Sequence, residues 1–179
     1  MDSSSISADD FQEAKSFVWS AIKNFKISSN DTRVGIIRFS TVANVIFDFQ
    51  FSADNNILRL EEVVDNIVLA EGSDTNTERA LQLARTDLFS AKGGSRPDVP
   101  KILVVITGGK SENILAVARA SMALKENHVT IVVVGIGDEV NIEELLTMAS
   151  SADDVILLRT FKELKKRVSR IKDIVCDGE

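Results

Sequence analysis

Two continuous apolar runs stand in the second half of the chain, KILVVIT at residues 101–107 and VTIVVVG at residues 129–135. Both are rich in β-branched residues and show no alternation of apolar and polar positions. That composition is typical of parallel strands that helices cover on both faces. We expect these two runs to form the buried centre of a sheet.

Helical patterns alternate with strand patterns on either side of these runs. Ser7 and Asp10 form a capping pair at the start of an amphipathic segment over about residues 8–25. Apolar residues recur at helical spacing in five further segments, 57–67, 80–88, 114–124, 142–149 and 161–175. A short strand is expected at Val155–Leu158. The alternation predicts a doubly wound α/β fold, with a mostly parallel sheet and helices on both faces.

One pair of strands is expected to be antiparallel. The segments Thr32–Phe39 and Val42–Phe49 are β-rich, and only Ser40 and Thr41 separate them. A link that short suits a hairpin and cannot hold a parallel crossover. The second strand is therefore placed at one edge of the sheet. Residues 91–100 hold both prolines and two glycines, and we expect an exposed loop there.

Length and charge limit the class of protein. A chain of 179 residues with 44% hydrophobic content suits one domain, placed here at residues 1–175 with a tail at 176–179. The net charge of −6 and the mixed signs along the chain give no field that attracts phosphate backbones, so nucleic acid is not an expected partner. No apolar run approaches the roughly 20 residues that span a bilayer, so no membrane insertion is expected.

The front of the chain departs from the doubly wound pattern. Such a unit opens with a buried strand that leads into its first functional loop, yet only Met1 and Asp2 precede a serine-rich loop. We infer that the domain lacks its first strand and that its stability is impaired. The strands on either side then close up, leave a groove, or accept a strand from another copy.

Three loops together resemble the von Willebrand factor type A family. They are Ser3-Ser4-Ser5-Ile6 before the capped helix, Thr75-Asn76-Thr77 at the start of a later helix, and Thr107-Gly108-Gly109 at the end of a buried strand. The likeness runs over residues 1–175 and is greatest to the domains of collagen VI and matrilin. It implies a Rossmann-like fold with strand order 3-2-1-4-5-6. It also implies a secreted, non-enzymatic adhesion or matrix-binding module, with matrix proteins such as collagens as partners.

The resemblance also implies a metal-ion-dependent adhesion site (MIDAS), in which an Asp-x-Ser-x-Ser loop, a threonine and a second aspartate hold Mg²⁺ or Mn²⁺. Ser3, Ser5 and Thr75 fall on the hydroxyl positions, whereas Met1 and Gly108 fall on the two carboxylate positions. Neutral hydroxyls alone do not offset the hydration of Mg²⁺. Nearby carboxylates that could substitute are Asp2, Asp74 and Glu112. We therefore predict weak or no binding of Mg²⁺ or Mn²⁺, and protein binding that does not depend on metal.

Two modifications bear on where the protein works. Asn30-Asp31-Thr32 is an N-glycosylation sequon in a polar loop, which suits a secreted module. Cys176 is the only cysteine and cannot form an internal disulfide. Its thiol is either reduced, as in an intracellular protein, or, as the resemblance implies, bonded to a cysteine that precedes the first strand or to another chain.

Six basic residues gather in the last helical segment: Lys162, Lys165, Lys166, Arg167, Arg170 and Lys172. They form either a solvated helix face, favoured by the helix dipole, or a site for an acidic partner such as a sulfated glycan.

Two alternative functions are considered. The first is an intracellular scaffold of the same family, in which Cys176 stays reduced. The second is a nucleotide-binding α/β enzyme, which the residues disfavour. His128 is the only histidine and stands where a loop or helix C-cap is expected. The turn Gly135-Ile-Gly137 lacks the third glycine of a dinucleotide fingerprint, and a phosphate loop ending in Lys110-Ser111 would need glycine at Val104.

Overall fold

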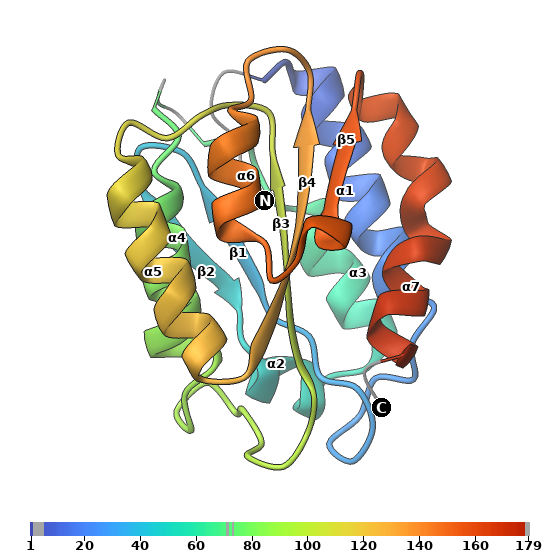
Figure 1. Cartoon of the computed structure of the whole chain (residues 1–179). Helices are drawn as coiled ribbons and strands as arrows, with labels where there is room; N and C mark the ends of the chain where they lie inside the picture. The colour runs from blue at the N-terminus through green and yellow to red at the C-terminus, as the bar shows by residue number, and fades with distance from the viewer. Residues whose placement is uncertain (2–5, 71, 73, 178–179) are drawn as a thin grey trace.

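The computed structural model describes residues 1, 6–70, 72 and 74–177. Three parallel strands, β3 (Lys101–Thr107), β4 (Val129–Ile136) and β5 (Val155–Leu158), form one sheet in the order β3-β4-β5. Two antiparallel strands, β1 (Ile36–Phe39) and β2 (Ala43–Phe47), form a second (Figure 1). The α/β class, the central parallel strands and the antiparallel hairpin are confirmed.

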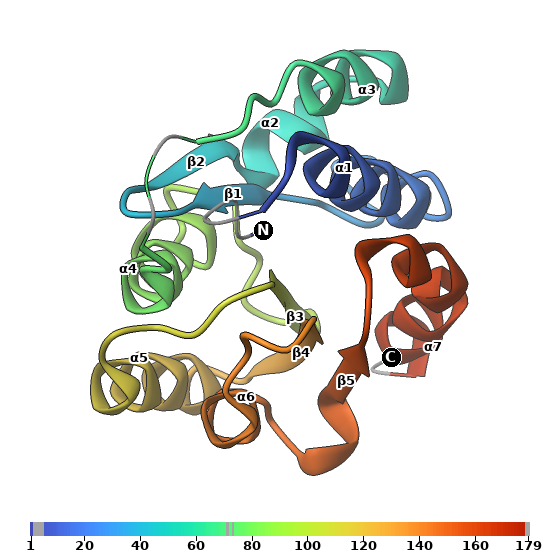
Figure 2. The same ribbon diagram turned by 90° about the horizontal axis from the view of Figure 1, so that it is seen from above.

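Helices cover two faces, as predicted. One face carries α1 (Ala8–Ile22), α3 (Ile57–Asp65) and α7 (Val168–Asp177); the other carries α4 (Thr77–Leu83), α5 (Ile114–Glu126) and α6 (Ile142–Met148) (Figure 2). Each set packs on its own apolar cluster. The first cluster includes Phe17 and Leu60, and the second includes Leu81 and Leu145. Burial of these side chains on both faces of the strands is the main force that holds the layers together.

The capping pair at the start of α1 is confirmed. The backbone N–H of Asp10 donates to Ser7 Oγ at 3.1 Å, and Ser7 Oγ donates to Asp10 Oδ2 at 2.8 Å. The helix ends at Ile22, before the predicted Phe25. The N–H groups of Asn24 and Phe25 bond to carbonyls three residues back, so the chain tightens into a turn there.

The predicted ends of the hairpin strands are wrong on their outer sides. Thr32 bridges to Ile27 in the preceding loop, so β1 begins only at Ile36. Asp48 Oδ1 accepts a hydrogen bond from the N–H of Phe51 at 2.8 Å and starts a helix, α2 (Phe49–Asp54), that the β-rich composition concealed. A favourable N-cap here outweighs the preference of phenylalanine for strands.

Two other segments depart in detail from the prediction. The last helical segment begins as a 3₁₀ helix, η3 (Phe161–Arg167), and becomes α-helical at α7, which continues to Asp177. Two shorter pieces are helical as well, a π-helical turn, η1 (Ala84–Leu88), that extends α4, and a 3₁₀ turn, η2 (Ala152–Asp154), before β5. The 91–100 loop has no helix or strand, but Gly93 and Gly94 are buried, so it is not exposed throughout.

Close packing around Gly94 accounts for the burial of this part of the loop. Its φ of +82° is unfavourable for other residues, and a Cβ there would lie 2.6 Å from the backbone nitrogen of Gln50. The loop thus packs closely on the start of α2.

The strand order implied by the resemblance is interrupted between β1 and β3. In the described residues no ladder joins the two sheets, and a cavity of about 700 Å³ separates them. A groove is one of the three arrangements expected for these two strands. Within the same residues, no helix is long and apolar enough to cross a membrane.

Candidate functional site

The candidate site lies at the edge where the parallel strands end. β3 pairs with β4 from Lys101 opposite Val129 to Thr107 opposite Gly135, so both strands reach this edge together. In open α/β sheets the carboxyl ends of the strands are the usual place for ligands. We refer to it below as the carboxyl edge.

Gly108 follows β3 at the carboxyl edge, and two apolar side chains close over it. A Cβ at Gly108 would lie 3.2 Å from Phe161 Cζ and 3.3 Å from Ile6 Cγ2. Such distances are tighter than ordinary van der Waals contact, so a larger side chain would require one neighbour to give by a few tenths of an ångström. The predicted carboxylate position therefore lacks the oxygen ligand and is closely packed by two apolar side chains.

Thr75, the predicted threonine ligand, lies in the loop before α4 and is 6% exposed. Asn76 is the N-cap of α4 and anchors this loop, because its N–H donates to Ser40 O at 3.0 Å and its Oδ1 accepts from the N–H of Arg79 at 3.1 Å. Asp74, a predicted substitute ligand, is exposed and accepts a hydrogen bond from Thr41 Oγ1 at 3.3 Å. This loop is thus tied to the hairpin.

Met1 occupies the other predicted carboxylate position and belongs to the core. Its side chain is 8% exposed and lies in the apolar cluster with Phe11 and Ile36. Asp2, Ser3 and Ser5 lie outside the described residues. Glu112, the last predicted substitute, is exposed in the loop between β3 and α5.

These residues do not fit a metal site of the expected kind. At the carboxyl edge, the predicted ligand positions among the described residues offer the Thr75 hydroxyl and no carboxylate at Met1 or Gly108. Across residues 1, 6–70, 72 and 74–177 no group of three or more His, Cys, Asp or Glu side chains is placed to hold a metal. Hard divalent cations need charged oxygen ligands. The described residues at this edge are therefore not expected to hold one.

Sequence reasoning missed one residue at this edge, Glu144 in the first turn of α6. Its carboxylate is 1% exposed and accepts a hydrogen bond from the backbone N–H of Ser111, with Oε2 at 3.0 Å. Asn141 caps the same helix by accepting from the N–H of Glu144 at 3.2 Å. The spacing Asn141-x-x-Glu144 matches a capping box, but the carboxylate holds the loop after β3 and not its own helix.

The von Willebrand factor type A domain family matches residues 1–170. The chain belongs to this family. It is 33% identical over 177 residues to the collagen alpha-6(VI) chain of Mus musculus, covering 97% of this chain and 8% of that one. It is 27% identical to matrilin-3 of Gallus gallus, over 97% of this chain and 38% of that one.

Solved structures agree on the fold of this von Willebrand factor type A domain. Proximal thread matrix protein 1 from the mussel byssus, solved with a zinc-occupied MIDAS motif, matches with a TM-score of 0.91 at 25% identity. The match covers 98% of this chain and 46% of that chain. The domain spans less than a tenth of the collagen VI relative and under half of the mussel protein.

The predicted glycosylation site of the domain lies in a hydrogen-bonded turn at its opposite, amino edge. Asn30 is exposed, and its carbonyl accepts a hydrogen bond from Arg96 at 3.1 Å. Asp31 forms an ion pair with Lys26 at 2.9 Å. The hydrogen bond from Ser28, followed by that from Lys26, lowers the pKa of Asp31 below its ordinary value of 3.8.

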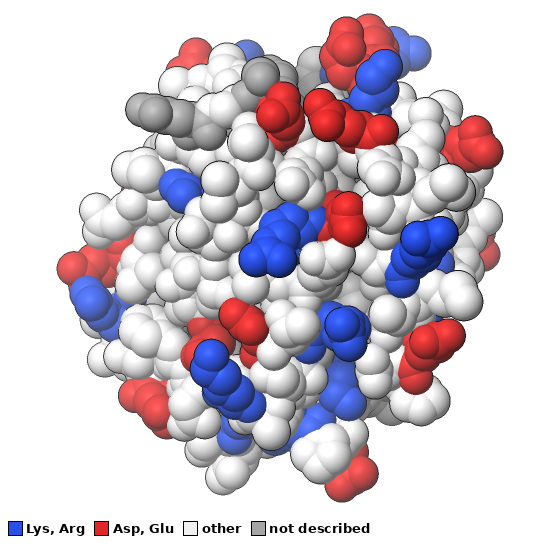
Figure 3. Space-filling model, turned by 90° about the vertical axis from the view of Figure 1, so that its left-hand side faces the viewer, with Lys and Arg blue, Asp and Glu red and all other residues white. Residues whose placement is uncertain are grey.

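The six basic residues of the last segment are all exposed, but two of them are already engaged. Lys165 forms an ion pair with Glu13 of α1 at 2.8 Å, and Arg170 donates to the carbonyl of Asp153 at 2.8 Å. On the face that α4 and α5 form, basic and acidic side chains are interspersed (Figure 3). The predicted mixture of signs is therefore seen on this face.

Two remaining predictions concern single residues. Cys176 lies in the last turn of α7, and its side chain is outside the described part of the chain. His128 adopts a positive φ of 58° and donates its N–H to Lys125 O at 2.9 Å, just after α5. Asn127 is the C-cap of α5, so of the two roles predicted for His128, loop or helix C-cap, the structure has the loop position just after the cap.

Proposed function

We propose that this domain is a non-enzymatic, secreted module that binds matrix proteins such as collagens through its carboxyl edge, around Thr75 and Gly108, without requiring a metal. The packing of Phe161 and Ile6 beside Gly108 carries the proposal. It supports an apolar, closed surface where a metal-dependent module would present a cation.

The relatives support the matrix part of the proposal. They include collagen VI and matrilin chains and a mussel matrix protein. The zinc-occupied motif in the mussel structure indicates that the fold itself is compatible with a metal. Metal independence therefore rests on this chain's own residues at positions 1 and 108, and not on the family.

Secretion is part of the same proposal. The exposed sequon at Asn30 and a disulfide from Cys176 to a cysteine outside this chain both suit an oxidising compartment. The alternative of an intracellular scaffold predicts unmodified Asn30 and a free thiol at Cys176. Mass spectrometry of the non-reduced protein, purified from the medium of expressing cells, separates the two.

The test of metal independence is binding to immobilised collagens in the presence of EDTA or Mg²⁺. We expect the same retained fraction in both buffers. Retention that disappears in EDTA and returns with Mg²⁺ would overturn metal independence while leaving the matrix function in place.

The test of the binding surface is a charge reversal at each end of β3. Lys110→Glu alters an exposed residue at the carboxyl edge, and Lys92→Glu alters an exposed residue in the loop before β3. We expect only Lys110→Glu to change collagen binding, since only it lies beside Gly108. Equal effects of the two variants on collagen binding would indicate that the binding surface lies elsewhere on the domain.

A further inference from the structure

β5 is the last strand of the parallel sheet, and one of its edges is open. Within the described part of the chain it pairs only with β4. Figure 2 shows it at the end of the sheet, with α6 on one side and α7 on the other. Leu157, in the second half of the strand, is 49% exposed. An unpaired strand edge of this kind is a template on which another extended chain can pair.

The backbone of β5 presents a defined set of groups at this edge. The N–H of Gly137 donates to Leu158 O at 2.9 Å, so the backbone of Leu158 faces β4. Because alternate residues of a strand direct their N–H and C=O groups to opposite edges, Leu157 and Arg159 face outward. Val155 faces outward too, but its N–H already closes the turn η2. The edge therefore offers the N–H of Leu157 and Arg159 and the C=O of Val155 and Leu157.

These groups match an antiparallel partner strand. In such a ladder, the partner residue opposite Leu157 exchanges two main-chain hydrogen bonds with it, and the residues two positions away bond to Val155 and Arg159. A partner of about five residues then forms about four hydrogen bonds and leaves the turn before β5 intact. Antiparallel pairing is also slightly more stable per residue than parallel pairing.

The α6 side of β5 is apolar. A Cβ at Gly135 would lie 3.4 Å from Leu157 Cδ2 and would also contact Leu145 of α6, so both leucine side chains lie on this side. α6 itself exposes two further apolar side chains, those of Ile142 and Leu146. Residues directly opposite each other on neighbouring strands turn their side chains to the same face. An apolar partner residue opposite Leu157 is therefore favoured.

The other side of β5 is flanked by positive charge. Ile156 turns its side chain to this side, into the cluster that α1 and α7 share. Arg170 of α7 reaches the start of β5, where it donates to Asp153 O at 2.8 Å. Lys166 and Arg167 stand one turn before Arg170, are exposed and form no ion pair within the described residues. Acidic partner side chains are therefore favoured on this side.

We propose that the open edge of β5 binds an extended acidic segment of another protein, which pairs antiparallel to β5 with its apolar residues on the α6 side and its acidic residues on the α7 side. Read from its amino end, a segment that fits opposite residues 159 to 155 is Glu-Glu-Val-Glu-Val, with its first glutamate opposite Arg159. A second copy of this chain fits less well, because pairing two β5 edges would bring the basic residues of two α7 helices together. The inference does not depend on what the carboxyl edge binds.

The first test is an NMR titration of the domain with the peptide Glu-Glu-Val-Glu-Val, acetylated and amidated at its ends. We expect the largest amide shifts at Leu157 and Arg159, the two outward donors. Gln-Gln-Val-Gln-Val keeps the alternation without the charge, and Glu-Glu-Pro-Glu-Val keeps the charge but has no N–H to donate to Leu157 O. Each of these control peptides should bind at least about ten-fold more weakly.

Variants of the chain separate strand pairing from charge. Leu157→Pro removes an N–H that β4 does not use, which an edge strand tolerates, and Leu157→Val is the matched control that keeps the N–H. Lys166→Glu with Arg167→Glu reverses the charge beside β5. We expect Leu157→Pro and the double variant each to bind Glu-Glu-Val-Glu-Val about ten-fold more weakly, and Leu157→Val to bind it as the unmodified chain does. Tm of each variant reports whether the fold is kept.

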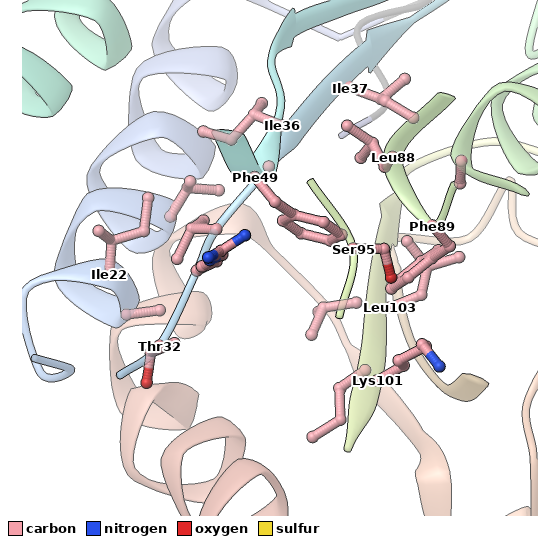
Figure 4. Close-up of a pocket in the computed structure, with 18 of the residues that line it drawn as sticks. Ile22, Thr32, Ile36, Ile37, Phe49, Leu88, Phe89, Ser95, Lys101 and Leu103 are labelled. Carbon is pink, nitrogen blue, oxygen red and sulfur yellow. The ribbon is translucent and has the colours of Figure 1, made fainter. Parts of the chain in front are cut away.

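Four outcomes would overturn the proposal. The first is equal binding of the three peptides. The second is a set of shifts centred on Ile36 and Leu103, which line the apolar groove between β1 and β3 (Figure 4), and not on β5. The third is a shift of Leu157 and Arg159 that grows with protein concentration in the absence of peptide, which would assign the edge to a second copy. The fourth is heparin binding to the basic side chains of α7 while the peptide leaves β5 unshifted, which would assign that face to a sulfated glycan.

Discussion

Glu144 and Ser111 join α6 to the loop that follows β3, through a carboxylate that accepts the backbone N–H at 3.0 Å. Glu144 is 1% exposed, and Ser111 is 9% exposed. A buried carboxylate bound to a main-chain donor holds that loop in one position. The carboxyl edge is therefore shaped by a side chain that is almost completely buried.

Glu144→Gln should destabilise the domain by about 1.5–3 kcal/mol, because it replaces a charge-assisted hydrogen bond in a buried site. Urea unfolding measures the change. Glu143→Gln is the matched control on the exposed side of the same turn and should stay within about 0.5 kcal/mol of the unmodified chain.

Ser111→Ala gives a second check on the same contact. Its backbone N–H still donates to Glu144, and its hydroxyl has no hydrogen-bond partner among the described residues. We expect little loss of stability or a small gain. A loss as large as that of Glu144→Gln would indicate that the hydroxyl, and not the main chain, holds the carboxylate.

Gly108→Asp restores the carboxylate that the resemblance leads one to expect, but it should not restore a metal site. Contact with Phe161 and Ile6 should cost about 1–3 kcal/mol of stability. Titration calorimetry with Mg²⁺ and Mn²⁺ should show no saturable heat for either protein. Lys110→Asp places the same group on an exposed neighbour and should leave stability unchanged. A 1:1 heat in the unmodified chain would contradict the predicted loss of metal binding.

Much of the fold could be predicted because the amino-acid composition of the central strands is enough to identify them. β3 and β5 have the predicted bounds, and β4 extends one residue further. Their β-branched runs have no competing helical period. The ends of the hairpin could not be predicted, because Asp48 caps α2 within a run of residues that otherwise favours a strand.

The candidate site was less predictable than the fold. The sequence places Thr75 and Gly108 in loops at the same edge, but it does not show that Phe161, 53 residues later, packs on Gly108. Glu144 carries a visible capping pattern, yet its partner lies 33 residues away. Long-range contacts of this kind depend on tertiary packing, which no local spacing records.

Glycosylation at Asn30 predicts a specific response to changes at Thr32. Thr32→Ser keeps the sequon and should keep the glycan, whereas Thr32→Ala and Asn30→Gln should both remove it. The exposed position of Asn30 makes the acceptor accessible. The measurement is the shift in gel mobility after glycosidase treatment of protein secreted by eukaryotic cells. Equal mobility of all four proteins before treatment would argue against modification at this site.

The turn around Asp31 should weaken in acid. The pKa of Asp31 is lowered in the folded state by the bonds from Ser28 and Lys26, relative to its ordinary value of 3.8. A carboxyl group of this kind contributes stability above pH 3.8, and the contribution is lost as the pH falls through the lower folded value. The difference in the free energy of unfolding between the unmodified chain and Asp31→Asn should therefore become smaller below about pH 3.8. Asp98→Asn, at an exposed aspartate, is the control in the same titration by urea unfolding.

The basic residues of the last segment give a graded prediction for acidic glycans. Lys166 and Arg167 are exposed, whereas Lys165 is paired with Glu13. If this face binds a sulfated glycan, Lys166→Glu with Arg167→Glu should lower the salt concentration that elutes the domain from heparin, because fewer counterions are exchanged. Lys92→Glu with Lys101→Glu makes the same change in net charge in the loop before β3 and at the first residue of β3. Equal losses for the two pairs would indicate that retention follows net charge alone, and the basic residues would then be a solvated helix face.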